Sequence, residues 1–128
     1  MTQLKAQDLR IGNWVQDAMH FKGYFQVEGI QETLIKSPEW WLKYDEIAPI
    51  KLTEEWLVKM GGIKPRLTTC IYFPASNIRA EIHFVEFRGG LVCEIHCSTG
   101  VVIPNDIKYV HSLQNLFYCL TGEELTIK

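Results

Sequence analysis

The segment at residues 93–97 combines residue types that often bind metal ions. It reads Cys-Glu-Ile-His-Cys, and thiolate sulfur and imidazole nitrogen are both ligands of zinc. In a β-strand, however, successive side chains point to opposite faces of the sheet. Cys93 and Cys97 would then face one way and His96 the other. These three residues could not surround one ion without a sharp bend, so we predict no metal and no cofactor here.

Further donors lie outside this segment. Cys70 and His83 could add ligands only if neighbouring strands brought them together, which leaves a metal protein or a thiol enzyme built on His83, His96 and the thiols as an alternative. The first ten residues lack the apolar run of a secretory signal, so we expect reduced thiols rather than disulfides. The simplest role for the cysteines is that of small apolar core residues. They are Cys70, Cys93, Cys97 and Cys119.

Nucleophilic catalysis would need a Cys or Ser beside a His that a third group orients. The chain contains thiols and histidines but no nucleophile elbow, no P-loop and no Gly-x-Gly-x-x-Gly. We therefore assign no catalytic residue and favour a protein that is not an enzyme.

Polar and aromatic residues near the C-terminus form two helical i, i+4 pairs. Gln114 pairs with Tyr118, and His111 pairs with Asn115, while Tyr109 precedes them. One interpretation is a recognition face of amides and aromatic rings that binds a partner. The other is an ordinary solvated helix flank whose Asn or His bonds to nearby backbone.

Trp40 and Trp41 are adjacent, so on a strand they must face opposite sides. One of them then meets a second core or lies exposed. An exposed Trp is a candidate hot spot for a protein interface, and in a small barrel it could instead stack on single-stranded nucleic acid.

Short β-rich segments at regular spacing dominate the first 50 residues and predict a small barrel-like unit of the SH3-like kind. The period then changes, and residues 53–60 predict a short helix. Thr53 can cap its start, while Gly61 or Gly62 can end it. The expected strands are residues 9–15, 24–28, 33–36 and 40–44.

The second half of the chain predicts a sheet followed by a helix. Residues 78–87 and 91–98 flank Arg88-Gly89-Gly90, which is typical of a β-hairpin. Residues 107–120 predict an amphipathic helix, although its start could lie near Val110 with the preceding residues extended. We expect the apolar stripe of this helix to pack on the sheet face that carries Leu91, Cys93, Ile95 and Cys97.

The composition is that of an ordinary globular domain. The chain has 128 residues, 13 Lys plus Arg, 15 Asp plus Glu, and 47% hydrophobic residues. Charges of both signs are spread evenly over the two halves, so no basic region is available for a phosphate backbone. We predict an α+β fold in a single domain, residues 1–128, with possible subdomains at 1–50 and 51–128, and a cytoplasmic location.

Three segments carry a family resemblance: residues 9–15, 50–57 and, most specifically, 109–125. Together they resemble a group of small uncharacterised proteins of Bacteroidetes bacteria and their prophages or mobile elements. The resemblance implies a bacterial or phage setting, and it carries no catalytic residue.

Three hypotheses for function follow. The first is a non-enzymatic interaction or accessory protein that binds an unknown protein partner, with a homo-oligomer possible and no membrane association expected. The second is a small nucleic-acid-binding protein that uses the N-terminal barrel, and the third is the metal or thiol enzyme. The candidate partner-binding residues are Trp40, Trp41, Tyr109, His111, Gln114, Asn115 and Tyr118.

Overall fold

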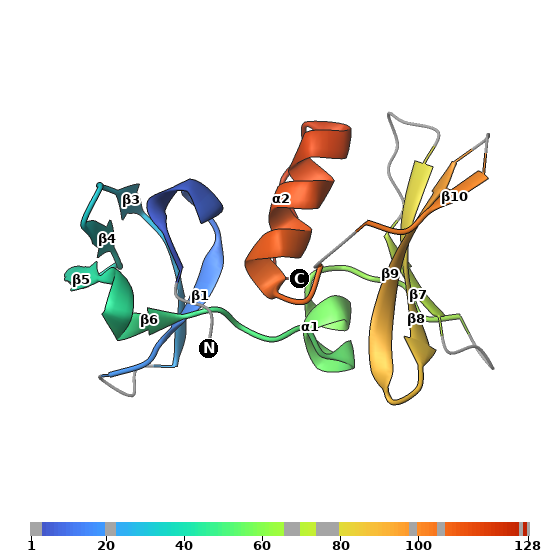
Figure 1. The fold of residues 1–128 in the computed structure, drawn as a ribbon, viewed down its shortest axis with the longest axis horizontal. Helices are drawn as coiled ribbons and strands as arrows, with labels where there is room; N and C mark the ends of the chain where they lie inside the picture. Colours follow the sequence, from blue (N-terminus) through green and yellow to red (C-terminus); the bar gives the residue numbers. More distant parts are fainter. Residues whose placement is uncertain are drawn as a thin grey trace. The chain divides into compact units, whose positions relative to one another are not determined.

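The computed structural model describes residues 4–19, 23–65, 70–73, 80–97, 100–104, 107–125 and 127. The fold is α+β, as predicted, and the described part of the chain contains antiparallel sheets and two α-helices (Figure 1). The contacts divide the chain into two compact units. Unit 1 comprises Met1–Lys51 and Tyr109–Asn115, and unit 2 comprises Leu52–Lys108 and Leu116–Lys128. Whether the units form one domain stays a prediction.

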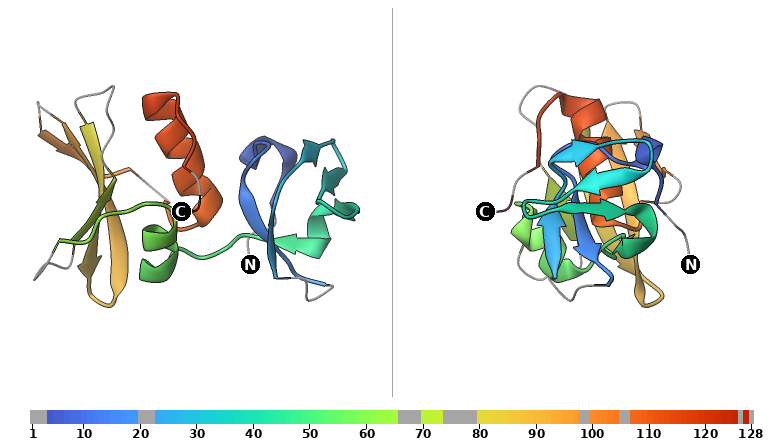
Figure 2. Two further views of the ribbon diagram at one scale, coloured as in Figure 1. Left: turned by 180° about the vertical axis from the view of Figure 1, so that it is seen from behind. Right: turned by 90° about the vertical axis from the view of Figure 1, so that its left-hand side faces the viewer.

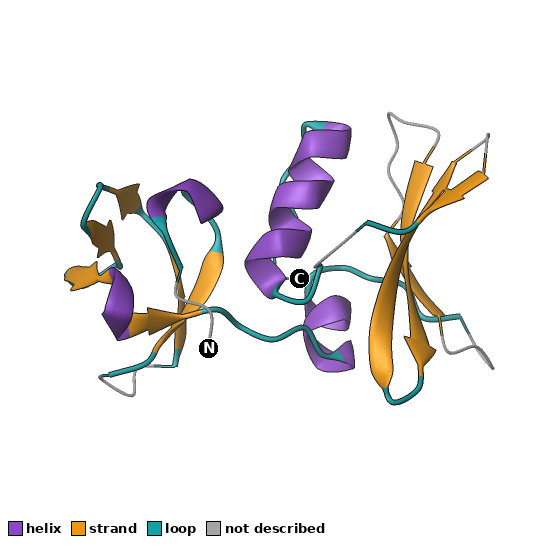
Figure 3. Cartoon of the chain, viewed as in Figure 1, coloured by secondary structure: helices purple, strands orange, loops and turns teal. Residues whose placement is uncertain are grey.

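Unit 1 is built from short strands and two 3-10 turns (Figure 3). The strands pair in two three-stranded antiparallel sheets, β2-β1-β6 and β3-β4-β5. The strands are β1 (Trp14–Asp17), β2 (Tyr24–Gln26), β3 (Gly29–Ile30), β4 (Leu34–Lys36), β5 (Trp41–Lys43) and β6 (Ile47–Ala48), and the turns are η1 (Ala6–Asp8) and η2 (Tyr44–Glu46).

The two small sheets of unit 1 share one hydrophobic core, but their strands do not close into a barrel in the residues described. Side chains of β1, β4 and β5 alternate between the core and the surface, so Val15, Ile35 and Leu42 enter the core. The expected strand at residues 9–15 begins only at Trp14, because a turn with Gly12 at φ +97° precedes it. The remaining buried members of the core are Leu4, Leu9, Val27, Tyr44 and Ile47.

Unit 2 begins with the short helix that the sequence predicted. Helix α1 (Glu54–Lys59) is capped by Thr53, whose hydroxyl accepts a hydrogen bond from the Trp56 amide at 3.2 Å. Gly61 follows at φ +96°, a left-handed conformation that ends the helix. The next glycine, Gly62, allows close packing, since a Cβ there would lie 2.6 Å from Ile71 Cγ2. The helix thereby packs its apolar face against β7 (Cys70–Phe73).

The four-stranded sheet of unit 2 has the order β10-β9-β8-β7 and is antiparallel throughout (Figures 1 and 2). The predicted hairpin joins β8 (Ala80–Phe87) to β9 (Gly90–Cys97), and β10 (Gly100–Val102) follows. Phe87 pairs with Gly90, so the turn consists of Arg88 and Gly89 rather than the Gly-Gly pair. Both turn residues have positive φ, +50° and +78°, which matches the twist of a tight hairpin. The predicted strand positions 78, 79 and 98 lie outside the described residues.

Helix α2 (Val110–Thr121) starts at the later of the two predicted positions. Tyr109 forms a β-bridge with Lys51, so the residue before the helix is extended. Val110, Leu113 and Phe117 of the apolar stripe are buried. The packing of this stripe on the sheet face stays a prediction. None of the helices in the described residues is long and apolar enough to span a membrane.

Candidate functional site

Gln114 and Asn115, two of the predicted binding residues, hold unit 1 together. The Gln114 side chain is fully buried. Its Nε2 donates to the Gly12 carbonyl at 3.0 Å, and its Oε1 accepts from the Trp14 amide at 2.8 Å. One amide side chain thereby satisfies both a donor and an acceptor of the backbone around the start of β1.

Asn115 makes a second set of contacts to the same turn. Its Oδ1 accepts from Arg10 Nε and from Asn13 Nδ2, both at 2.9 Å. Its Nδ2 donates to the Asp8 carbonyl at 3.1 Å. We call Arg10, Asn13, Gln114 and Asn115 the amide cluster. The hydrogen bonds of this cluster are made inside unit 1, so these side chains hold the fold of the unit together.

Tyr109 and His111 form a stacked pair with ring centroids 5.8 Å apart. The His111 side chain is buried, and its Nδ1 has no hydrogen-bond partner in the described structure. Burial lowers the pKa of His111, while the nearby Asp8 carboxylate acts in the opposite direction. Tyr118 is 42% exposed and belongs to unit 2, so the predicted helical set does not lie in a single unit.

Trp40 and Trp41 are both partly exposed, at 39% and 43%, but their surroundings differ. Trp41 lies over Gly29, since a Cβ built there would be 3.3 Å from its ring. Trp40 closes the turn between β4 and β5, where its amide donates to Ser37 Oγ at 3.0 Å. The Ser37 amide and hydroxyl both donate to the Trp40 carbonyl at 2.8 Å. Pro38 restricts the backbone between them, so the turn holds the Trp40 backbone in place.

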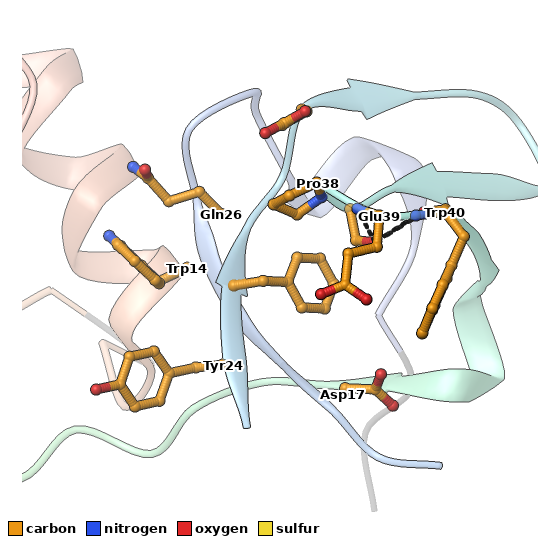
Figure 4. A pocket seen from close by; sticks show the side chains of 10 residues that line it. Trp14, Asp17, Tyr24, Gln26, Pro38, Glu39 and Trp40 are labelled. Carbon is orange, nitrogen blue, oxygen red and sulfur yellow. Dashed lines mark hydrogen bonds between the residues drawn. The ribbon is translucent and has the colours of Figure 1, made fainter. Parts of the chain in front are cut away.

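A groove of about 320 Å³ lies beside Trp40 in unit 1. Figure 4 shows Pro38, Glu39 and Trp40 on one side of β2, and Trp14, Tyr24 and Gln26 on the other. This division follows the strand register, since Trp14 pairs with Gln26 and both side chains lie on one face. The rings of Trp14 and Tyr24 meet edge to face at 5.5 Å. The other lining residues are Asp17, Phe25, Glu28 and Ser37.

The lining of this groove combines aromatic rings with carboxylates. Asp17, Glu28 and Glu39 contribute three acidic groups, and no Lys or Arg is among the described residues that line it. A basic residue lies close by, since Lys36 Nζ donates to the Ser37 carbonyl at 2.7 Å. Aromatic faces and carboxylates both attract cations. The groove is therefore suited to a positively charged group carried on an apolar stem.

Cys93 and His96 lie on opposite faces of the sheet, as the strand alternation predicted. Cys93 is buried, and burial together with the Glu94 charge raises its pKa to about 12. On the face of the sheet opposite Cys93, His96 Nε2 lies 2.9 Å from Glu94 Oε1. Cys70 lies on this second face, 3.2 Å from His83 Nδ1. The neighbouring strands thus bring together the two donors that sequence reasoning could pair only conditionally.

Sequence reasoning missed Asp17, Glu28 and Glu39 as site residues. Nothing in their local sequence marks them, because the groove forms only where β1, β2 and the turn at Ser37 meet. The only local indication was the Ser37-Pro38 sequence, which predicts a turn just before Trp40 and Trp41. Comparison of the chain with protein-family models, with curated protein sequences and with solved structures found no match.

Proposed function

We propose that this protein is a non-enzymatic interaction module whose groove beside Trp40 binds an extended segment of a partner protein. The occupant carries an arginine or lysine side chain next to an apolar residue. The observation behind this proposal is the combination of two exposed carboxylates, Glu28 and Glu39, with exposed aromatic rings along one groove. The third carboxylate of the lining, Asp17, is buried and accepts a hydrogen bond from the Met19 amide.

The physical argument rests on complementarity. The stem of Arg or Lys can lie on the Trp40 ring while its charged head stays near Glu39. A cation over an aromatic face contributes about 0.5–2 kcal/mol, depending on how far it is desolvated. The Ser37 turn holds the Trp40 backbone before binding, so less conformational entropy is lost when a partner binds.

The resemblance to small proteins of Bacteroidetes and their prophages or mobile elements supports an accessory role in a bacterial or phage setting. Within this proposal unit 1 is an SH3-like unit, in the sense that small β-sheets around one core present a groove to a peptide. Nucleic-acid binding by the same surface is disfavoured, because the carboxylates of the groove repel phosphate.

A peptide-display selection tests this proposal. Random nonapeptides on phage are selected against the whole protein, and the enriched peptides are synthesised and titrated by fluorescence anisotropy. We expect enrichment of Arg or Lys beside an apolar residue. Trp40→Ala should weaken binding roughly tenfold, which corresponds to about 1.4 kcal/mol, and Glu39→Gln should weaken it less.

Matched variants control for general effects of the substitutions. Trp41→Ala removes the same ring from the adjacent position outside the groove, and Glu32→Gln removes an exposed carboxylate that does not line it. Both should keep the affinity within about twofold, a change below 0.5 kcal/mol. Selected peptides without a basic residue, no enrichment at all, or equal binding to a folded Trp40→Ala variant would each overturn the proposal.

A further inference from the structure

The outer face of the sheet in unit 2 carries a compact group of metal-ligating residue types. On β8 and β9, Glu and His alternate with the apolar side chains that face the core, such as Ile82 and Cys93. The strand register places Glu81 opposite His96 and His83 opposite Glu94. Cys70, from β7, completes the set. We call Cys70, Glu81, His83, Glu94 and His96 the His–Glu face.

Cys70, His83 and Glu81 are joined in a chain of polar contacts. Cys70 Sγ lies 3.2 Å from His83 Nδ1, and His83 Nε2 lies 3.3 Å from Glu81 Oε1. A metal-binding imidazole typically gives its other N–H to a carboxylate, which sets its tautomer and its orientation. With Nε2–H directed at Glu81, the Nδ1 lone pair of His83 points toward the sulfur and is available to an ion.

Neighbouring rings hold the His83 imidazole in this orientation. Tyr72 stacks on it at a centroid distance of 5.7 Å and an interplanar angle of 24°. The His96 ring lies 4.0 Å from it. His96 has its own carboxylate partner, since its Nε2 lies 2.9 Å from Glu94 Oε1. Two imidazole–carboxylate pairs therefore lie side by side on adjacent strands.

A thiol beside an imidazole could be either a nucleophile or a metal ligand. The charges around Cys70 distinguish these two roles. Burial and the charges of Glu94 and Glu81 raise the pKa of Cys70. Reactive cysteines need the opposite environment, one that stabilises the thiolate. The same carboxylates favour metal binding, because they attract a divalent cation. A bound cation in turn deprotonates the thiol that coordinates it.

The distance between sulfur and nitrogen is suited to a shared ion. In a tetrahedral zinc site, with bonds of about 2.3 Å to sulfur and about 2.0 Å to nitrogen, these two ligands lie about 3.5 Å apart. Cys70 and His83 need to separate by only a few tenths of an ångström. Among the described residues, no three such donors already surround one point, so a third protein ligand has to turn toward the ion.

From this geometry we propose that the His–Glu face binds a divalent transition-metal ion of the zinc class through Cys70 Sγ and His83 Nδ1. Glu81 orients the His83 ring through its contact with His83 Nε2. Glu94 or His96 supplies the third protein ligand by side-chain rotation, and water completes the coordination. The half-buried face leaves room for this, since the side chains of Glu94 and His96 are 27% and 38% exposed. This site belongs to unit 2, whereas the groove belongs to unit 1.

Titration with cobalt(II) tests the proposal, because a thiolate ligand produces a charge-transfer band in the near ultraviolet. The full chain is reduced, freed of metal and titrated under anaerobic conditions. We expect one equivalent of cobalt to give this band and zinc to displace it. Cys70→Ser should abolish the band, and His83→Gln should weaken binding at least tenfold. Circular dichroism verifies that each variant is folded.

Cys119→Ser is the matched control, because Cys119 is an exposed thiol of the same unit. It should leave the band and the affinity unchanged. The absence of a thiolate–cobalt band in the wild type would overturn the proposal. Persistence of the band in Cys70→Ser, or wild-type affinity in folded His83→Gln, would overturn it as well. Native mass spectrometry with zinc gives the stoichiometry independently of the absorbance.

Discussion

The amide cluster of unit 1 and the His–Glu face of unit 2 are both groups of hydrogen-bonded polar side chains, but they differ in burial. In the amide cluster, Gln114 is fully buried and pairs with backbone groups. On the His–Glu face, His83 and His96 remain partly exposed and pair with the partly exposed carboxylates of Glu81 and Glu94.

Burial explains why the two regions should respond differently to substitution. A buried polar group that loses its partner incurs the full desolvation penalty, about 1–3 kcal/mol for each group. A solvated ion pair contributes little, because water replaces the partner. The amide cluster therefore stabilises the fold, whereas the His–Glu face can exchange its internal contacts for those of a ligand.

The largest loss of stability is expected from the apolar residue next to the amide cluster. Leu113 is fully buried, so Leu113→Ala should lower the free energy of unfolding by roughly 2–5 kcal/mol. Urea denaturation followed by far-ultraviolet circular dichroism measures this. A loss below about 0.5 kcal/mol, which is typical of surface positions, would contradict the burial of this side chain.

Gln114→Ala should follow closely, with a loss of roughly 2–4 kcal/mol, because it leaves the Trp14 amide and the Gly12 carbonyl without their partner. The same denaturation experiment applies. Tyr118→Ala, at an exposed position of the same helix, serves as the control and should change stability little. Equal effects of the two substitutions would remove the distinction between buried and exposed polar positions.

His111 should make the stability of the protein depend on pH. Its pKa is lowered in the folded state by burial, so the unfolded chain binds the proton more readily. Stability is then complete above the unfolded pKa of about 6.5 and declines as the pH falls below it. The slope for one proton is at most about 1.4 kcal/mol per pH unit.

Denaturation of the wild type and of His111→Gln at a series of pH values between about 7.5 and 5 checks this prediction. The variant should lose less stability over this interval than the wild type does. Parallel pH profiles for the two proteins would show that His111 is not the responsible group.

The smallest effect is expected on the His–Glu face. His96→Gln should change the free energy of unfolding by less than about 0.5 kcal/mol in metal-free buffer, because the partly exposed His96–Glu94 pair is solvated. Thermal and urea denaturation in the presence of a chelator measure this. A loss comparable to that of Gln114→Ala would make the two regions alike and assign the His–Glu face a structural role.

Local patterns in the sequence were sufficient for several elements. Thr53 and Gly61 mark the two ends of α1, because capping and helix termination depend on residues within one turn. The hairpin of β8 and β9 was also predictable. Its observed turn, Arg88 and Gly89, lies one residue earlier than the predicted Gly-Gly turn. That shift depends on strand register, which pairing across the whole hairpin determines.

The sequence predicted a barrel-like, SH3-like unit for residues 1–50 without determining whether its strands close, and the described strands do not close into a barrel. Their lengths of two to four residues were not evident from composition, and the strands pair in two separate sheets instead. The shared core nevertheless matches the alternation of apolar residues such as Val15 and Ile35. Alternation determines which side chains point inward, but it does not determine which strands pair.

The sequence by itself determined the α+β class, the caps of α1 and the alternation that separates Cys93 from His96. These features depend on neighbours along the chain. Only the tertiary structure decided that Gln114 reaches the turn at Gly12, that Cys70 lies next to His83, and that three carboxylates line the groove that Trp40 also lines. Such contacts join residues far apart in the chain, and local periodicity contains no information about which distant segments become neighbours.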